Sequence, residues 1–124
     1  MEIKLSISTM GRTTEIHIFK DPTSPTNYKE FTLSCTRGGK EQKYIIAPAE
    51  LQEIFKAVHS ARIPPYVGRE IGLDGESYEL TFGESWERTS YSWWMRAGAD
   101  WEPLEEIAGM VLSLAQRYTG ALYI

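Results

Sequence analysis

Hydrophobic and polar residues alternate with a period of two over the first part of the chain, which is typical of half-buried β-strands. Apolar side chains occupy every second position of residues 3–7, and the alternation resumes over residues 16–19 after a turn at Met10-Gly11-Arg12. A third alternating run, residues 31–35, ends at Arg37-Gly38-Gly39-Lys40, where paired glycines suit a tight turn because they adopt positive φ easily. With a return strand over residues 42–46, these runs predict two consecutive hairpins.

The hydrophobic period then lengthens to that of an amphipathic helix. Pro48 suits a first helical turn, and Glu50 complements the positive end of the helix dipole. We expect the helix to stop near Ile63, because the residue before a proline is disfavoured in the helical conformation. The apolar stripe consists of Leu51, Ile54, Phe55 and Val58.

Residues 73–112 predict a ββα unit that contains all four tryptophans. A turn at Asp74-Gly75 precedes a strand over residues 78–82, and a hairpin across residues 83–88 leads to a strand over residues 89–96. In the helix that follows, Asp100 is a candidate N-cap, and Gly120 suits a left-handed residue after the last turn. Its predicted buried stripe is Trp101, Leu104, Ala108, Val111, Leu112, Ala115 and Tyr118.

The order of these elements, ββββ-α-ββ-α, predicts an α+β fold. Strands joined by short links and interrupted by single helices favour a mostly antiparallel sheet of about six strands with the two helices packed on one face. The chain has 124 residues, which fits a single α+β domain over residues 1–124.

Charge and cysteine content narrow the classes of partner. A net charge of −4 opposes approach to phosphate backbones, so we expect no nucleic-acid partner. The single cysteine, Cys35, rules out an internal disulfide and is expected to be a packed core thiol. The start of the chain alternates like a strand where a signal peptide would be apolar, and no stretch is long enough for a membrane span. We therefore expect a cytoplasmic protein without a membrane partner.

The sequence contains no motif for cofactor or metal chemistry. It lacks a glycine-rich phosphate loop, a Gly-x-Gly-x-x-Gly turn and a His-Glu-x-x-His helix, so we expect no cofactor, no metal site and no assigned catalytic residue. His17 and His59 are interpreted as ordinary packed or solvent-facing histidines. The basic residues around the second hairpin are interpreted as a solvated strand edge, and these are Lys29, Arg37, Lys40 and Lys43.

Acidic residues cluster along the predicted hairpin of residues 74–88. A pair of them acting as acid and base on a sugar would make the protein a small hydrolase, but solvated charges are the preferred interpretation. The carboxylates concerned are Asp74, Glu76, Glu79, Glu84 and Glu87. An acidic rim around Trp86 would suit a protein partner with a basic surface.

Adjacent tryptophans in the last predicted strand must point to opposite faces of the sheet. Tyr91 and Trp93 share one face, which we expect to meet the helices, whereas Trp94 shares the other face with Ser92 and Arg96. Trp94 is then either exposed as a contact residue or covered, by a neighbouring strand's side chains or by the Tyr66 loop. The candidate partner-binding residues are Trp94, Arg96, Trp86, Glu84, Glu87, Asp74 and Tyr66.

The C-terminal half carries a pattern that resembles one in small bacterial α+β proteins, most of them uncharacterised. The pattern is Leu73-Asp74-Gly75, Tyr78-Glu79-Leu80, Tyr91-Ser92-Trp93-Trp94 and Trp101-Glu102-Pro103-Leu104. Some proteins of this type are immunity proteins that neutralise a cognate toxin. The resemblance covers about the last half of the chain and transfers no catalytic residue.

These observations favour a non-enzymatic protein-binding module, most concretely a toxin-neutralising immunity protein whose cognate toxin has a basic surface. A structural or oligomeric scaffold is one alternative, and the small hydrolase with acidic residues 74–88 is another. A symmetric homodimer is expected if Trp94 and its neighbours leave a sizeable apolar patch on the uncovered sheet face.

Overall fold

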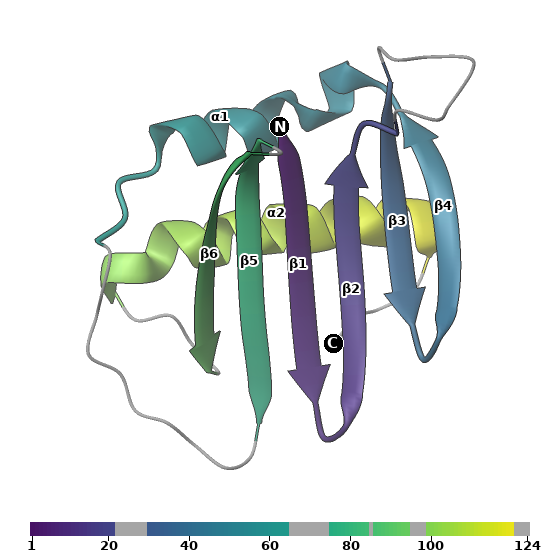
Figure 1. Cartoon of the computed structure of the whole chain (residues 1–124), viewed down its shortest axis with the longest axis horizontal. Helices are drawn as coiled ribbons and strands as arrows, with labels where there is room; N and C mark the ends of the chain where they lie inside the picture. Colours follow the sequence, from purple (N-terminus) through teal and green to yellow (C-terminus); the bar gives the residue numbers. More distant parts are fainter. Residues whose placement is uncertain (22–29, 65–74, 85, 95–98, 121–124) are drawn as a thin grey trace.

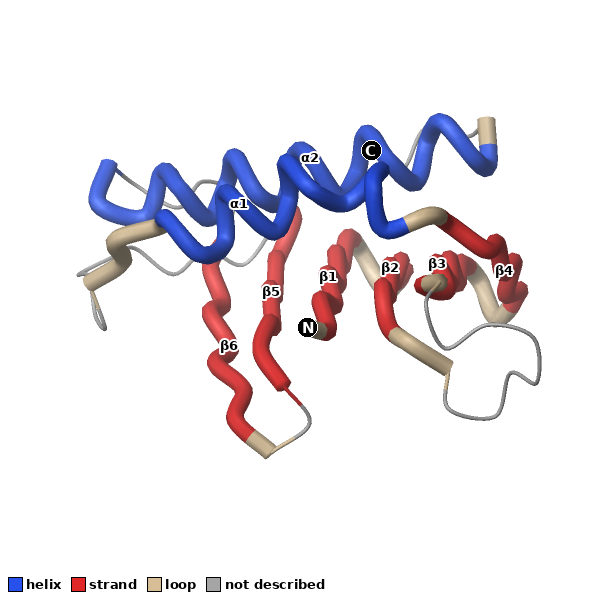
Figure 2. Tube along the Cα trace, turned by 90° about the horizontal axis from the view of Figure 1, so that it is seen from above, coloured by secondary structure: helices blue, strands red, loops and turns tan. Residues whose placement is uncertain are grey.

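Six antiparallel strands form one sheet, and two helices lie side by side on one of its faces (Figures 1 and 2). The computed structural model describes residues 1–21, 30–64, 75–84, 86–94 and 99–120. This architecture confirms the predicted α+β fold and the order ββββ-α-ββ-α. The elements are β1 (Glu2–Thr9), β2 (Arg12–Phe19), β3 (Phe31–Arg37), β4 (Lys40–Ile46), α1 (Gln52–Ser60), β5 (Glu76–Glu84), β6 (Glu87–Trp94) and α2 (Glu102–Thr119).

The strand order is β4-β3-β2-β1-β5-β6, so β1 lies inside the sheet between its hairpin partner β2 and the later strand β5. Leu5 lies opposite Ile16 on one side and Leu80 on the other. The second predicted hairpin is confirmed, with Gly38 and Gly39 at φ of 59° and 79°. From the β4 edge, α1 leads back across the sheet toward the side where β5 and β6 lie (Figure 1).

The core lies between the sheet and the helices and is built by the period-two alternation of the strands. Ile3, Leu5 and Ile16 are fully buried, and so are Leu104 and Val111 of α2. Burying an aliphatic side chain of this size contributes about 1.5–3 kcal/mol, so this layer is the main source of stability. Cys35 belongs to the same layer at 2% exposure, which confirms it as a core thiol.

The start of α2 differs from the prediction. Asp100 lies in a short 3-10 turn (Ala99–Trp101), and no side chain caps the helix, which begins after Trp101. The Trp101 indole is buried, and its Nε1 donates to the carbonyl of Pro64 at 2.9 Å, so tertiary packing fixes the helix start where a local cap was expected. At the other end Gly120 has φ 68°, and its N–H donates to the carbonyl of Gln116 at 2.8 Å, as predicted.

The buried stripe of α2 is wider than the sequence suggested. Ile107 and Leu114 are buried and were missed, whereas Leu112 and Tyr118 are only half-buried. The first helix, α1, ends at Ser60, a few residues before the predicted stop.

The two adjacent tryptophans of β6 point to opposite sides, as expected. Trp93 faces the helices at 3% exposure, and its ring stacks on Tyr78 with centroids 5.5 Å apart and planes 10° apart. Trp94 lies on the other face and is half-buried.

We predict that Trp93→Ala lowers the free energy of unfolding by ~3–5 kcal/mol, because it leaves a cavity in the core. Trp94→Ala is the matched control and should cost much less, since this ring lies outside the core layer. Urea unfolding of both variants measures the difference. Equal losses from the two substitutions would contradict the packing described above.

Candidate protein-binding surface

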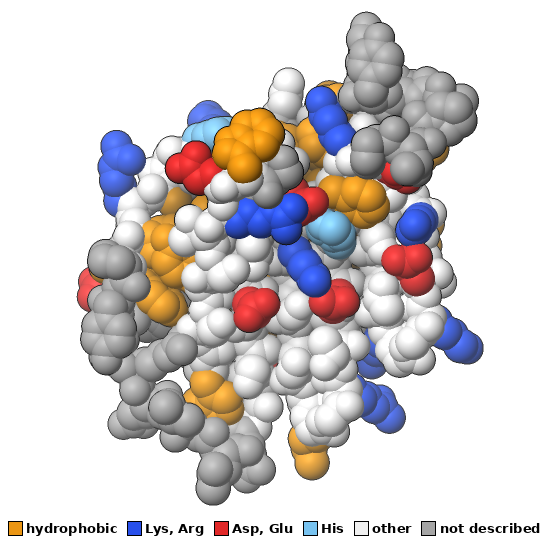
Figure 3. All heavy atoms as spheres, in the orientation of Figure 1, with side chains coloured by type: hydrophobic (Ala, Val, Ile, Leu, Met, Phe, Trp, Pro, Cys, Tyr) orange, Lys and Arg blue, Asp and Glu red, His pale blue; other side chains and the backbone are white. Residues whose placement is uncertain are grey.

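The sheet face away from the helices carries none of the described helices, and we call it the open sheet face (Figure 2). Figure 3 views this face: backbone and side chains that are neither hydrophobic nor charged, drawn in white, fill much of its centre, charged groups cross it, and most hydrophobic groups lie toward its periphery. Strand register places on it Glu2, Lys4, Ser6, Ser8, Thr13, Glu15, His17, Phe19, Thr32, Ser34, Thr36, Glu41, Lys43, Ile45, Ser77, Glu79, Thr81, Arg88, Ser90, Ser92 and Trp94.

A polar network centred on Glu2 connects three strands of the open sheet face. The Glu2 carboxylate contacts Arg88 Nη2 at 2.8 Å and His17 Nε2 at 3.3 Å, which links β1 with β6 and β2. The His17 ring also stacks on Phe19, with centroids 4.4 Å apart. A shallow pocket at this place is lined by Glu2, Lys4, His17, Thr81 and Arg88.

Hydroxyl groups and carboxylates on this face are also paired with each other. Lys4 Nζ lies 3.1 Å from Glu15, and Ser6 donates to the same carboxylate at 3.4 Å. Ser34 donates to Glu41 at 2.8 Å. The exposed ion pair of Lys4 with Glu15 contributes at most about 1 kcal/mol, so it can be exchanged for contacts with a partner at small cost to the fold.

Trp86 is the most exposed tryptophan of the described chain, at 83%, and lies at the tip of the β5–β6 hairpin. Glu84 and Glu87 are opposite each other beside it and are both exposed. The Glu84 carboxylate is partly neutralised by the N-terminal ammonium at 3.2 Å, and Arg88 Nε donates to the Glu84 backbone carbonyl at 3.3 Å.

Trp94 lies at the other end of β6 from Trp86, opposite Ser77. The strand between them spans about 25 Å, so the two tryptophans belong to separate contact regions and not to one patch. Ile45, 63% exposed, lies on the opposite edge strand. Trp86, Trp94 and Ile45 thus lie apart on the described surface, and the expected homodimer stays a prediction. Arg96, Asp74 and Tyr66 lie outside the described residues.

The carboxylates that the sequence placed on one hairpin are spread over different surfaces. Glu76 is on the helix-facing side and accepts a hydrogen bond from Tyr78, whereas Glu79 is exposed on the open sheet face. Glu84 and Glu87 lie at the hairpin tip, and Asp74 is outside the described residues. His59 is exposed at the end of α1. The described carboxylates thus share no single pocket.

Two tyrosines have strongly shifted pKa values on the helix side. Burial and the hydrogen bond to Glu76 raise the pKa of Tyr78 to about 12. Burial and a 2.6 Å hydrogen bond to Glu50 raise the pKa of Tyr118 to about 12, and the same bond lowers the pKa of the Glu50 carboxyl. Both phenols therefore stay protonated at neutral pH, where they act as donors that hold the helix layer.

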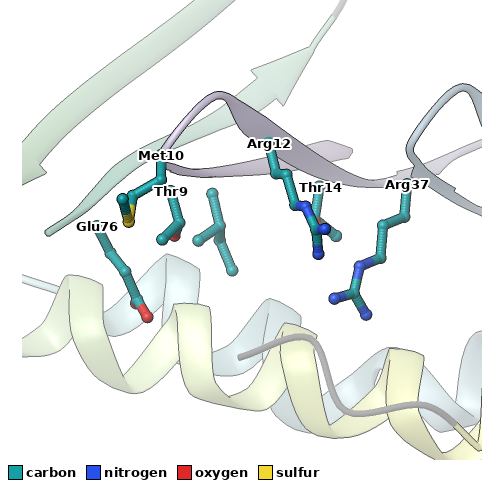
Figure 4. Close-up of a pocket in the computed structure, with 7 residues that line it drawn as sticks. Thr9, Met10, Arg12, Thr14, Arg37 and Glu76 are labelled. Atoms are coloured by element: carbon teal, nitrogen blue, oxygen red, sulfur yellow. The ribbon is translucent and has the colours of Figure 1, made fainter.

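A second pocket was missed by the sequence analysis. It lies where the turn end of the sheet meets the helix layer, and Arg12 and Arg37 enter it from different hairpins (Figure 4). Alternation alone could have placed Arg12 on the helix-facing side, but only the strand order brings it beside Arg37.

The predicted basic hairpin is divided by the sheet. Lys43 lies on the open sheet face, 3.7 Å from Glu41, whereas Arg37 and Lys40 face each other across the strands on the opposite side. Lys29 lies outside the described residues. Strand β4, which carries Lys40 and Lys43, is an edge of the sheet, where exposed lysines discourage pairing with another chain.

Over the described ranges, no three histidine, cysteine, aspartate or glutamate side chains gather closely enough to hold a metal ion. None of the helices described in the structure has the length and apolar character to cross a membrane. No protein-family model matches this chain, and no curated protein matches it.

The raised pKa of Tyr78 predicts a loss of stability at alkaline pH. A phenol with a pKa of 10.0 when unfolded and about 12 when folded stabilises the fold fully below pH 10, and this contribution disappears as pH rises through 12. Because the phenol is half-exposed, solvent screening reduces the contribution to roughly 1 kcal/mol.

We therefore expect Tyr78→Phe to lower the free energy of unfolding at pH 8 and to reduce its further decline between pH 10 and 12. Urea unfolding of the variant and the original chain across this range gives the difference. Tyr44→Phe is the matched control, because Tyr44 donates only to Gln42 on an edge strand. Parallel pH curves for Tyr78→Phe and the original chain would contradict the assignment.

Proposed function

We propose that this protein is a non-enzymatic protein-binding module that uses the open sheet face as its contact surface. In its most concrete form it is a bacterial cytoplasmic immunity protein that neutralises a cognate toxin. The observation that carries the proposal is the one-sided arrangement of the helices, which leaves the hydroxyl-rich face of a six-stranded sheet for a partner.

The dimensions of the face suit a protein better than a small molecule. Six strands of seven to nine residues at about 4.8 Å spacing give a surface of about 24 by 24 Å, roughly 600 Å². A standard protein–protein interface buries about 800 Å² on each partner, which this face approaches when the Trp86 hairpin tip is included.

The side chains of the face also suit a protein partner. Serine and threonine hydroxyls both donate and accept hydrogen bonds, and an interface of this size uses about ten such bonds. Trp94, Trp86 and Arg88 belong to the residue types that dominate binding hot spots, and they lie around the hydroxyl-rich centre. The net charge of −4 favours encounter with a partner that presents a basic surface.

Photo-crosslinking from two matched serines tests this surface. Ser92 is exposed on the open sheet face and Ser113 is exposed on α2, so p-benzoylphenylalanine is placed at each position in turn. The partner tested is the product of the neighbouring reading frame, co-expressed with each variant. We expect the partner to cross-link from position 92 and not from position 113. We also expect co-expression of this protein to relieve the growth inhibition that the partner causes. Cross-links only from position 113, or growth inhibition that persists, would overturn the proposal.

Truncation of Trp94 separates binding from folding. We expect Trp94→Ala to weaken the captured partner's affinity by about 2 kcal/mol or more, as at other tryptophan hot spots. The urea midpoint should change little, because the ring is outside the core. Isothermal titration and urea unfolding give both quantities, with Ser113→Ala as the control. An unchanged affinity would remove Trp94 from the contact surface.

A further inference from the structure

An open groove runs between the two helices, and we call it the helix groove. Its described lining comes from the short 3-10 turn Pro48–Leu51, from the start of α1 and from α2, and none of it comes from the sheet. The helices lie side by side on one face of the sheet (Figure 2). The helix groove therefore lies on the outer surface of the helix layer, on the other side of the molecule from the open sheet face.

The bottom of the helix groove is apolar. Ile54 is buried at 3% exposure and Met110 is half-buried, whereas Gly109 beside it is exposed. A Cβ at Gly109 would meet no atom within 4 Å beyond the neighbouring backbone of its own helix. Glycine destabilises a helix interior because its backbone is the most flexible. At this position the missing side chain leaves room in which a side chain of a bound partner can reach the backbone of α2.

Carboxylates dominate the charge of the helix groove. Its described lining contains Glu50, Glu53 and Glu106 with one cation, Arg117. Tyr118 donates to Glu50 at 2.6 Å, and this bond, with a smaller contribution from Arg117, lowers the pKa of the Glu50 carboxyl. Glu53 and Glu106 are exposed, and neither forms an ion pair with another described residue. Two negative charges along the groove are therefore left for a cationic partner.

The length and charge of the helix groove limit what it can hold. Along α2 its lining extends from Glu106 to Arg117, about 16 Å at ~1.5 Å per residue, which accommodates about three turns of another helix. Amphipathic helices bind protein grooves of this kind through apolar side chains spaced along one face. Lysines beside that face can keep their stems on the groove while their ammonium groups reach flanking carboxylates. A second copy of this chain suits the groove poorly, because a net charge of −4 makes the copies repel each other.

We propose that the helix groove binds a basic amphipathic helix of a protein partner. The apolar face of this helix lies over Gly109 and Met110, and its cationic side chains pair with Glu53 on α1 and with Glu106 on α2. This inference is independent of the proposed function, because the partner differs from the one expected on the open sheet face and binds on the other side of the molecule.

Titration with three synthetic peptides of about sixteen residues, followed by amide chemical shifts, tests the helix groove. The first peptide has leucines along one face of a helix and lysines elsewhere. The second has glutamates in place of the lysines, and the third contains the residues of the first in an order that is not amphipathic. We expect saturable shifts at Glu53, Gly109 and Met110 with the first peptide, and binding of the other two that is weaker by about tenfold or more.

Several outcomes of this titration would overturn the proposal. These are no saturation with the first peptide, equal binding of either control peptide, and shifts centred on the open sheet face. Shifts of the same amides that depend on protein concentration in the absence of peptide would make a second copy of the chain the occupant, and would also overturn it.

A substitution at Gly109 separates binding from folding. We expect Gly109→Gln to raise the urea midpoint, because glutamine favours a helix more than glycine does and its Cβ has space. The same side chain occupies the groove and should weaken binding of the first peptide about tenfold or more. An unchanged affinity would contradict the position of the bound helix.

Two double variants of equal charge test the ion pairs. Glu53→Gln with Glu106→Gln should weaken binding of the first peptide about fivefold to tenfold, the loss of two exposed ion pairs. Glu79→Gln with Glu87→Gln removes the same charge from the open sheet face and the hairpin tip, and should leave the affinity within about twofold, as remote screened charges do. Equal effects of the two double variants would reduce the interaction to general charge attraction and contradict the proposal.

Discussion

The structure depends on burying only one face of the sheet. Every second residue of β1, β2 and β3 contributes to the layer beneath the helices, and the fully buried Ile3, Leu5 and Leu33 show how completely that layer is sealed. A shift of one residue in any of these strands would move its whole apolar set to the other face, so burial also fixes the register. The hydroxyl side chains of the opposite face are a consequence of the same alternation.

One-sided burial also separates the two surfaces discussed above. The open sheet face has side chains that pair with each other across strands, such as Glu2 with Arg88, and substitutions there leave the core layer intact. The pocket lined by Arg12 and Arg37 lies on the helix-facing side, beside the core residue Ile7. The two surfaces can therefore change independently, because no residue belongs to both.

The parts of the fold that could be predicted are those that depend on residues close together in the sequence. Alternation over residues 3–7 and the helical spacing of Leu104, Ala108 and Val111 depend only on neighbours along the chain, and Gly120 ends α2 by its own backbone freedom. The prediction that Asp100 caps α2 is wrong because a tertiary contact, the hydrogen bond from the Trp101 indole to the Pro64 carbonyl, fixes the start of the helix. The contact of Glu2 with Arg88 and the position of Arg12 beside Arg37 depend on strand order, which local patterns do not contain.

The position of β1 inside the sheet has a consequence for synthesis on the ribosome. β1 to β4 form a meander of neighbouring hairpins that can pair as soon as residue 46 has emerged, but the second edge of β1 is completed only by β5, Glu76–Glu84. Until then an apolar strand has unpaired backbone groups on one side, and α2, which covers the core, has not yet been made. Such an edge readily pairs with other chains, so the nascent protein is most prone to aggregate while its middle third is being translated.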